Sequence, residues 1–405
     1  MDKLLILIPL ENVGFNFVQT FSLFVLISLF LFPFLLILFK IKKTNISTVL
    51  LMLVAWSIFS TMLNILLRQQ VQENLLRPLP GLIIGLSVFF VAREIFYRSD
   101  DVKIFKSLYY SLLILFSFFI YDFLFRFNLT FRIYASYTEP SHLGSDIALI
   151  YVPILMLYSK YLSQIKKAFV FLLLSSVTIL TFSATTYVKI LFFFLFFLFL
   201  NITRLKLILF YLLCFVSTAY IAYFLFSKYF PDNYFFSMIT NVMNNITKGY
   251  TYLNVSLTDR FSFWIFLLNL KNIDFDKEIL LFLIIGYGLG ADTLFLEFLP
   301  YEVAEQIIGV KKFSSYITSF LARIFFYNGL IGVILYIISI FFMYKKVKYI
   351  SFSPKEKKML FCWLATLVFS SSFDLAPFQT VALWFLPAYI DGVALKLKKN
   401  MYKQQ

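Results

Sequence analysis

A carboxylate and an imidazole lie three residues apart, at the predicted entrance of a helix. They belong to Glu139 and His142, and His142 is the only histidine in the sequence. Either side chain could act as a general base that removes a proton from an attacking hydroxyl group. A structural role is the alternative, because the serine between them, Ser141, is a residue type that caps helix N-termini. Glu139 and His142 are therefore candidate catalytic residues.

Arginines near the ends of apolar segments form a second candidate group. A guanidinium makes paired hydrogen bonds with phosphate oxygens, so several converging arginines would suit a diphosphate group. The alternative for an arginine at a helix end is a side chain that extends to lipid phosphates. Arg323 lies about five residues into an apolar run, where a cation needs a wet cavity or a partner. The candidates for binding are Arg77, Arg132, Arg260 and Arg323, and Arg260 is also counted as catalytic.

No metal or cofactor is predicted. With one histidine the sequence has no HExxH pair, and it has no phosphate-binding P-loop. Cys214 and Cys362 both lie in apolar runs and are interpreted as small buried hydrophobic residues rather than as a disulfide or zinc ligands.

The composition is that of a membrane protein. Hydrophobic residues make up 61% of the 405 positions and charged residues only 14%, whereas soluble domains are nearer one half apolar. Apolar windows of roughly 17 to 25 residues, long enough to cross a bilayer, recur along the chain. We therefore expect an all-α, polytopic transmembrane helical bundle with about eleven spans, in a range of ten to twelve. The predicted spans are 15–39, 46–67, 79–97, 104–125, 143–159, 168–183, 187–201, 206–227, 319–343, 359–373 and 379–395.

Lysine and arginine are distributed unevenly between the two sides of the predicted spans. One set of connecting segments carries 22 of them and the alternate short segments carry 5. Because cationic side chains are retained on the cytoplasmic side, this asymmetry predicts a cytoplasmic C-terminus and a long loop on the outer face. The net charge of +15 thus reflects topology, and no nucleic acid is expected as a partner.

The topology divides the chain into three parts. N-terminal transmembrane helices cover 1–227, the long outer loop covers 228–318, and C-terminal transmembrane helices cover 319–405. The side of the N-terminus stays open. Eleven spans place it outside, and a twelfth crossing through Leu4–Leu10 would place it inside.

The long loop is expected to contain short helices and a glycine-rich turn. Gly286, Gly288 and Gly290 follow the apolar stretch Glu278–Ile285, which is too short to cross the bilayer and is expected to lie against it or to dip into it. A dinucleotide-binding fingerprint is excluded, because no parallel strand precedes the glycines. The glycines are predicted to permit a tight turn or a close approach to bound substrate.

Four pieces of the sequence, in this order and spacing, resemble the O-antigen polymerase and O-antigen ligase superfamily of bacterial envelope enzymes. The pieces are Glu139–Gly144, which is similar to Glu-Pro-(Ser or Asn)-x-Leu-Gly; Leu180–Thr185, similar to Leu-Thr-x-Ser-x-(Ser or Thr); Asp259-Arg260 with Trp264 and then Ile285–Gly290; and Gly329–Gly332. Together they cover about half the chain.

The resemblance implies metal-independent glycosyl transfer on the outer leaflet of the bacterial cytoplasmic (inner) membrane. Donor and acceptor would be undecaprenyl-diphosphate-linked oligosaccharides, and the product would be the O-antigen of lipopolysaccharide or a capsule. Arg260 would bind the donor diphosphate, and the glycines would approach glycan or lipid. Membrane lipid and a chain-length regulator protein are the further partners expected. In ligases a His-Asn pair precedes the Gly-Leu-Ile-Gly piece, whereas this chain has Thr318-Ser319 there, which favours the polymerase branch.

Two other functions stay open. A flippase or other transporter of polysaccharide units would be expected to have two similar halves with polar residues at the midplane. The sequence has no such halves, and its ionisable residues crowd the predicted outer ends. An O-antigen ligase is the other alternative, and the threonine at 318 argues against it.

Overall fold

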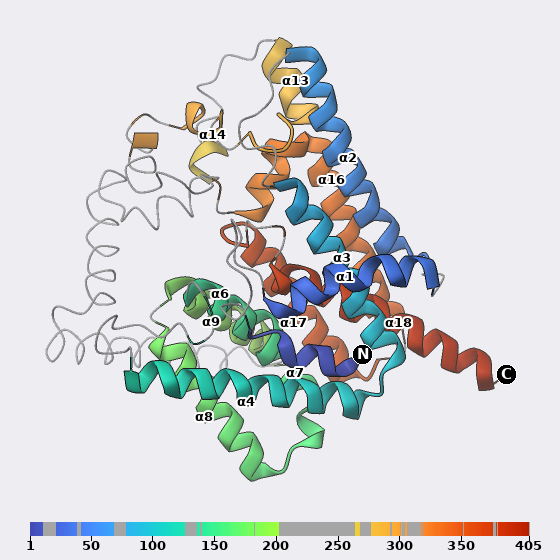
Figure 1. Ribbon diagram of the computed structural model, residues 1–405, viewed down its shortest axis with the longest axis vertical. Helices are drawn as coiled ribbons and strands as arrows, with labels where there is room; N and C mark the ends of the chain where they lie inside the picture. Colours follow the sequence, from blue (N-terminus) through green and yellow to red (C-terminus); the bar gives the residue numbers. More distant parts are fainter. Residues whose placement is uncertain are drawn as a thin grey trace, which may run out of the picture.

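The computed structural model is a bundle of helices (Figure 1). The structure describes residues 1–10, 22–38, 42–68, 78–125, 135, 137, 140–181, 183–201, 264–267, 277–291, 294–299, 301, 304–305, 317, 319–350, 352–375, 378 and 380–404. Within these ranges the strand-like pairing is limited to one antiparallel bridge between Ser319 and Leu375. The all-helical class predicted from the sequence is thus confirmed for the described part of the chain.

The described residues form sixteen helices and helical turns. In order they are η1 (Asp2–Leu7), α1 (Leu23–Leu38), α2 (Asn45–Arg68), α3 (Pro78–Arg98), α4 (Asp101–Phe125), α6 (Pro140–Asp146), the π-helical turn η2 (Ile147–Tyr151), α7 (Val152–Leu157), η3 (Ser159–Tyr161), α8 (Gln164–Leu180), α9 (Ala184–Asn201), α13 (Lys277–Ile285), α14 (Leu294–Glu297), α16 (Phe320–Tyr349), α17 (Pro354–Ser371) and α18 (Val381–Gln404).

Several helices have the character of membrane spans. In the part of the chain that the structure describes, four helices are long and apolar enough to cross a membrane, namely α2, α3, α4 and α16, and shorter apolar helices cover Leu23–Ile37, Ser141–Leu157 and Thr185–Leu200. Large apolar side chains also face outward, and Phe30, Ile37 and Ile165 are 72%, 78% and 84% exposed. A broad apolar exterior is costly in water but is accommodated by lipid, so these features indicate a membrane protein.

The predicted number of crossings is not confirmed. A helix occupies ten of the eleven predicted spans, and the other span, 206–227, lies outside the described residues. Four helices in the described part meet the length and composition of a span. Two of the other helices do not meet this criterion for local reasons. α8 has only 17 residues, and α17 carries three lysines and a glutamate in its first turn and a half.

α3 is the central helix of the bundle. In the most apolar stretch of α3, 83% of the residues are buried inside the protein, compared with 33% in that of α4. α3 also packs extensively on α18 and α1. Two glycines allow α3 and α18 to approach closely. A Cβ atom on Gly85 would collide with the indole of Trp384, and one on Gly392 would collide with the carbonyl of Arg93. Small residues at such crossings are typical of helix packing in membranes.

Two further helix pairs position the residues discussed below. α2 lies alongside α16, with α13 at the upper end of the pair in Figure 1. α9 packs on α17, where the rings of Phe192 and Phe369 stack with centroids 4.1 Å apart. This stack fixes the register of α9 against α17.

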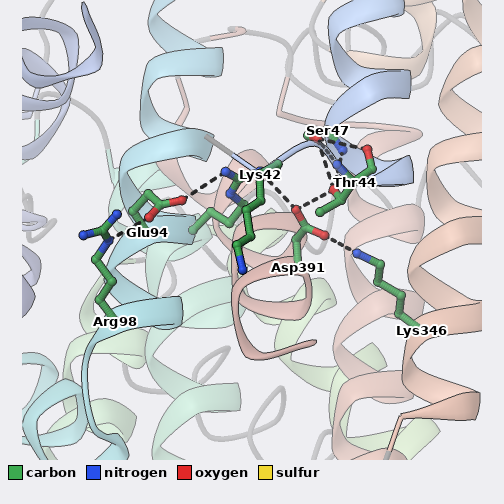
Figure 2. A network of polar contacts seen from close by, with 8 residues as sticks. Lys42, Thr44, Ser47, Glu94, Arg98, Lys346 and Asp391 are labelled. Atoms are coloured by element: carbon green, nitrogen blue, oxygen red, sulfur yellow. Dashed lines mark hydrogen bonds and ion pairs between the residues drawn. The ribbon is translucent and has the colours of Figure 1, made fainter. Parts of the chain in front are cut away.

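A buried carboxylate joins four helices at one end of the bundle (Figure 2). Asp391 of α18 is fully buried, and its carboxylate pairs with Arg93 of α3 at 3.5 Å and with Lys346 of α16. It also accepts a hydrogen bond of 2.8 Å from Thr44, the residue before α2. Thr44 and Ser47 exchange backbone-to-hydroxyl hydrogen bonds of 2.9 and 3.1 Å, so the same threonine caps α2.

The network extends along α3. Arg93 also pairs with Glu94 at 3.0 Å and donates a 3.0 Å hydrogen bond to the carbonyl of Lys42, and Glu94 pairs with Arg98 at 2.8 Å. A charge in an apolar interior is tolerated only when it is paired and hydrogen-bonded. The contacts to Asp391 therefore fix the ends of α2, α3, α16 and α18 relative to one another.

Replacing Asp391 by alanine should destabilise the bundle strongly, because the fully buried Arg93 would lose one of its two carboxylate partners and the partly buried Lys346 would lose this ion pair. Removal of one partner from a buried ion pair costs about 3–5 kcal/mol, and we expect a loss of that size in the free energy of unfolding. Denaturant titration of the purified protein in lipid nanodiscs would measure it. Lys103→Ala, which breaks an exposed pair with Asp100, is the matched control and should leave the midpoint in place. Equal midpoints for the two variants would contradict this role.

Candidate functional site

The structure describes five of the nine residues that the sequence predicts for the site. His142, Arg323, Gly286, Gly288 and Gly290 are among them, whereas Glu139, Arg77, Arg132 and Arg260 lie outside the described residues. His142 and Arg323 belong to one end of the bundle, where α6, α9 and α16 begin and α17 ends. The glycines belong to a turn that packs against the middle of α16.

His142 lies in the first turn of α6. This helix begins at Pro140, a residue type favoured at a first helical position because its fixed φ suits the helix and it lacks the N–H that would have no partner. Ser141 is therefore inside the helix, and its carbonyl accepts a 2.9 Å hydrogen bond from the hydroxyl of Ser145. α6 packs on α9 through Gly144, where a Cβ atom would collide with Thr186.

A buried lysine and an aspartate form an ion pair beside α6. Lys189 of α9 has no solvent-exposed surface, and it pairs with Asp374, whose side chain is 15% exposed in the turn after α17. The lysine ammonium also donates a 2.6 Å hydrogen bond to the hydroxyl of Ser145 on α6. The pair thus joins three segments that are far apart in the sequence.

The start of α16 is attached to the same turn. Phe320 donates its N–H to the carbonyl of Asp374 at 3.0 Å. Ser319 caps the helix, because its hydroxyl accepts a 3.2 Å hydrogen bond from the N–H of Ala322 and donates one of 3.1 Å to the carbonyl of Ser371. The position of Asp374 and the position of the first turn of α16 are therefore coupled.

Arg323 lies in that first turn and is 7% exposed. A cation at a helix N-terminus is disfavoured by the helix dipole, so it needs compensating partners. Its guanidinium donates a 3.1 Å hydrogen bond to the carbonyl of Ile317, and it lies over the rings of Tyr327 and Phe378 at 5.8 and 6.0 Å. The sequence predicted either a wet cavity or a partner for Arg323, and the structure provides partners.

The glycine-rich turn packs against a break in α16. Gly286, Gly288 and Gly290 have φ angles of 80°, 84° and 88°, a region that favours glycine. Gly329 interrupts α16 with a φ of 61° and a ψ of −161°. A Cβ atom on Gly286 would collide with the backbone at Tyr327, which shows how closely the two backbones approach.

The three carbonyl groups directly before this break, of Phe326, Tyr327 and Asn328, have donors from other parts of the protein. The N–H groups of Tyr287 and Gly288 donate to the carbonyls of Phe326 and Tyr327 at 2.8 and 3.0 Å. From α2, the Trp56 indole donates to the carbonyl of Asn328 at 2.9 Å, and the hydroxyl of Ser60 donates to that of Tyr327 at 3.0 Å. The segment that the sequence assigned to the long loop therefore packs into the bundle at this point.

α2 holds the turn as well. Asn64 donates to the carbonyl of Gly286 at 2.9 Å, and the hydroxyl of Thr61 accepts from the N–H of Leu289 at 2.9 Å. The sequence predicted a tight turn or a close approach to substrate. In the structure the close approach of Gly286 and Gly288 is to other parts of the protein, α16 and α2.

Lys189 and Asp374 were not predicted as site residues. A signal was present, because Lys189 is a single cation near the start of a long apolar run, and an ionisable residue at such a place is a candidate functional residue. Asp374 gave a weaker signal as a lone carboxylate in a segment without lysine or arginine. Among the described residues, no three His, Cys, Asp or Glu side chains gather in a way that could hold a metal ion.

The fold and this site define a helical membrane protein with a buried ion pair at one end of its bundle. No protein-family model matches the chain, and no curated protein matches it either.

Replacing Gly286 by alanine should destabilise the protein, because alanine is strained at a φ of 80° and its Cβ would press on α16. We expect the free energy of unfolding to fall by about 1–3 kcal/mol. Denaturant titration would measure it against Leu281→Ala, a change on the exposed side of α13 that should have a smaller effect. If Gly286→Ala had the same free energy of unfolding as the wild-type protein, the proposed packing of Gly286 against α16 would be wrong.

Proposed function

We propose that the protein is a polymerase that joins undecaprenyl-diphosphate-linked oligosaccharide repeat units into O-antigen or capsular polysaccharide. The reaction would be metal-independent glycosyl transfer on the outer face of the bacterial cytoplasmic membrane. The observation that carries the proposal is that the separate pieces of the family resemblance pack against each other in pairs. Gly144 lies on Thr186, beside the Leu180–Thr185 piece, and Gly286 lies on the Tyr327–Asn328 backbone, directly before the Gly329–Gly332 piece.

The ion pair connects these two pairs of segments. Lys189 binds Ser145 and Asp374, and the backbone of Asp374 binds the first residue of α16, nine residues before Gly329. Residues that are scattered over 190 positions of sequence are thus parts of one connected structure. Chance matches of short motifs give no reason for such adjacency among the described pieces, so the packing supports the resemblance. The Asp259-Arg260 part of the third piece lies outside the described residues.

The distribution of buried charge agrees with the proposed topology. The Asp391 network draws on the side chains of Arg93 and Lys346 and on the backbone carbonyl of Lys42, all from segments rich in lysine and arginine. The Lys189–Asp374 pair comes from segments that are poor in them. With the basic set in the cytoplasm, the C-terminus is cytoplasmic and the site containing His142 and Arg323 faces the periplasm.

The proposed chemistry is a displacement at the anomeric carbon of the donor glycan. The acceptor hydroxyl oxygen forms the new glycosidic bond while the bond from the anomeric carbon to the diphosphate oxygen breaks. Undecaprenyl diphosphate leaves with the electron pair, and a base takes the hydroxyl proton. Arginines would bind the diphosphate, with Arg77, Arg132, Arg260 and Arg323 as candidates, and Glu139 or His142 would serve as the base.

The alternative of a transporter is less well supported. Transporters use broken helices whose unwound carbonyls coordinate ions or substrate. In α16 the carbonyls of Phe326, Tyr327 and Asn328 accept hydrogen bonds from the protein itself, so the break is used for packing. The ligase alternative stays disfavoured by the threonine at 318.

Deleting the gene in its host should leave surface glycans that stop at a single repeat unit, because units would still be made, moved across the membrane and attached. A ladder gel of surface glycans would measure this. A flippase deletion would instead abolish surface repeats, and a ligase deletion would leave chains on the lipid carrier. Either of those outcomes would contradict the polymerase.

Arg132→Ala and Arg260→Ala should each abolish chain lengthening while the protein still inserts into the membrane. The reason is that each would remove a guanidinium that pairs with the diphosphate. Complementation of the deletion strain, with membrane levels checked by immunoblot, would test it. Lys103→Ala, an exposed change at the other end of the bundle, is the control. A normal ladder with both arginine variants would overturn their assignment.

A further inference from the structure

We propose that Asp374 is a catalytic carboxylate of this site, and that Lys189 and Ser145 are the residues that position it. The proposal rests on the polymerase function and adds a base candidate to it. As the acceptor hydroxyl oxygen bonds to the anomeric carbon of the donor, the hydroxyl proton would pass to the carboxylate of Asp374. The electron pair of the broken bond leaves with the lipid diphosphate.

Burial distinguishes the two charged residues of the pair. Lys189 has no exposed surface, so it cannot meet a substrate, whereas the side chain of Asp374 is 15% exposed. Asp374 lies in the turn between α17 and α18, at the end of the bundle that also carries His142 and Arg323. The arrangement is that of a reactive group with access from outside and an inaccessible partner behind it.

The cost of burying Lys189 argues against a purely incidental pair. An ammonium in an apolar interior is costly even when it is paired, and replacing a buried pair by apolar residues is often neutral or stabilising. The cation nevertheless favours the charged form of the neighbouring carboxylate, and a carboxylate must be charged to accept a proton. The Ser145 hydroxyl, at 2.6 Å from the ammonium, fixes its direction.

Two buried hydroxyl groups next to the pair lack partners. Neither the Thr186 hydroxyl, three residues before Lys189 on α9, nor that of Ser370, four before Asp374, has a hydrogen-bond partner in the described part of the protein. Residues three apart share a helix face, so Thr186 lies on the same side of α9 as Lys189. Ser370 lies beside Asp374, because its carbonyl accepts a 2.9 Å hydrogen bond from the N–H of Asp374. Buried hydroxyls without a partner are uncommon in folded proteins. Both side chains are fully buried, so these hydroxyls lie behind the exposed part of Asp374 and do not themselves meet a substrate.

Other charged groups surround the pair. Among the described residues, the ionisable side chains at this end of the bundle include His142 and Asp146 on α6 and Arg323 on α16, in addition to Lys189 on α9. Asp146 is buried and accepts a 2.8 Å hydrogen bond from the Tyr137 hydroxyl. It is therefore less accessible than Asp374, which makes Asp374 the better candidate among the described carboxylates of this region.

The test uses the full-length protein in nanodiscs and lipid-linked repeat units extracted from the deletion strain. Chain elongation is measured per folded molecule as a function of pH. Asp374→Asn should lower the rate by about 100-fold or more, as expected for loss of a general base, and Asp374→Glu should keep part of it. Lys189→Met should move the acid limb of the pH profile to higher pH, because the carboxylate loses the cation that favours its charged form.

A second variant separates folding from chemistry. Lys189→Met combined with Asp374→Asn removes both charges, so no unpaired charge is left buried, and it should fold but not elongate. Asp391→Asn, which alters a buried carboxylate at the other end of the bundle, should lower the yield of folded protein without changing the pH profile.

The outcomes distinguish this proposal from the function on which it rests. If wild-type protein elongates the repeat units and the Lys189→Met, Asp374→Asn double variant does so at a similar rate, the pair is structural and the assignment of Asp374 is overturned. If wild-type protein elongates nothing, the polymerase proposal fails and this assignment fails with it.

Discussion

The pairing of buried charge at Asp391 is the constraint on which the arrangement of helices depends. An apolar bundle in lipid gains little from burying one hydrocarbon surface against another, so specific contacts must fix its helices. Asp391 provides them, because one carboxylate binds Arg93 of α3, Lys346 of α16 and Thr44 before α2. Gly392 allows the necessary approach of α18 to α3. These contacts hold the ends of α2, α3 and α16 together next to Asp391.

α16 carries this constraint to the other end of the bundle. Lys346 near its C-terminus is bound by Asp391, and Ser319 and Phe320 at its N-terminus are bound to the turn of Asp374. Between them, the break at Gly329 would weaken the helix if its carbonyls lacked partners. The glycine-rich turn and α2 supply those partners, so α16 connects the two buried ion-pair clusters despite its kink.

Much of the fold followed from the sequence, because apolar run length is a local property. Helices such as α2, α3 and α4 match the predicted spans 46–67, 79–97 and 104–125 within a few residues. The site was predicted less well for a physical reason. Pairing between Lys189 and Asp374 depends on how α9 packs against α17, which the stack of Phe192 on Phe369 fixes and which periodicity does not reveal.

The glycines illustrate the same difference between local and tertiary information. Their spacing predicted a tight turn or a close approach to substrate, and Gly286, Gly288 and Gly290 have the positive φ angles of a turn. What the turn approaches could not be read from the spacing, because the partner backbone at Tyr327 is some forty residues away and is exposed only by the break at Gly329. A turn that supplies donors to a broken helix is needed for the position of α16, and α16 in turn holds Arg323 and the backbone of Asp374. The glycines therefore influence the site indirectly, through the position of α16.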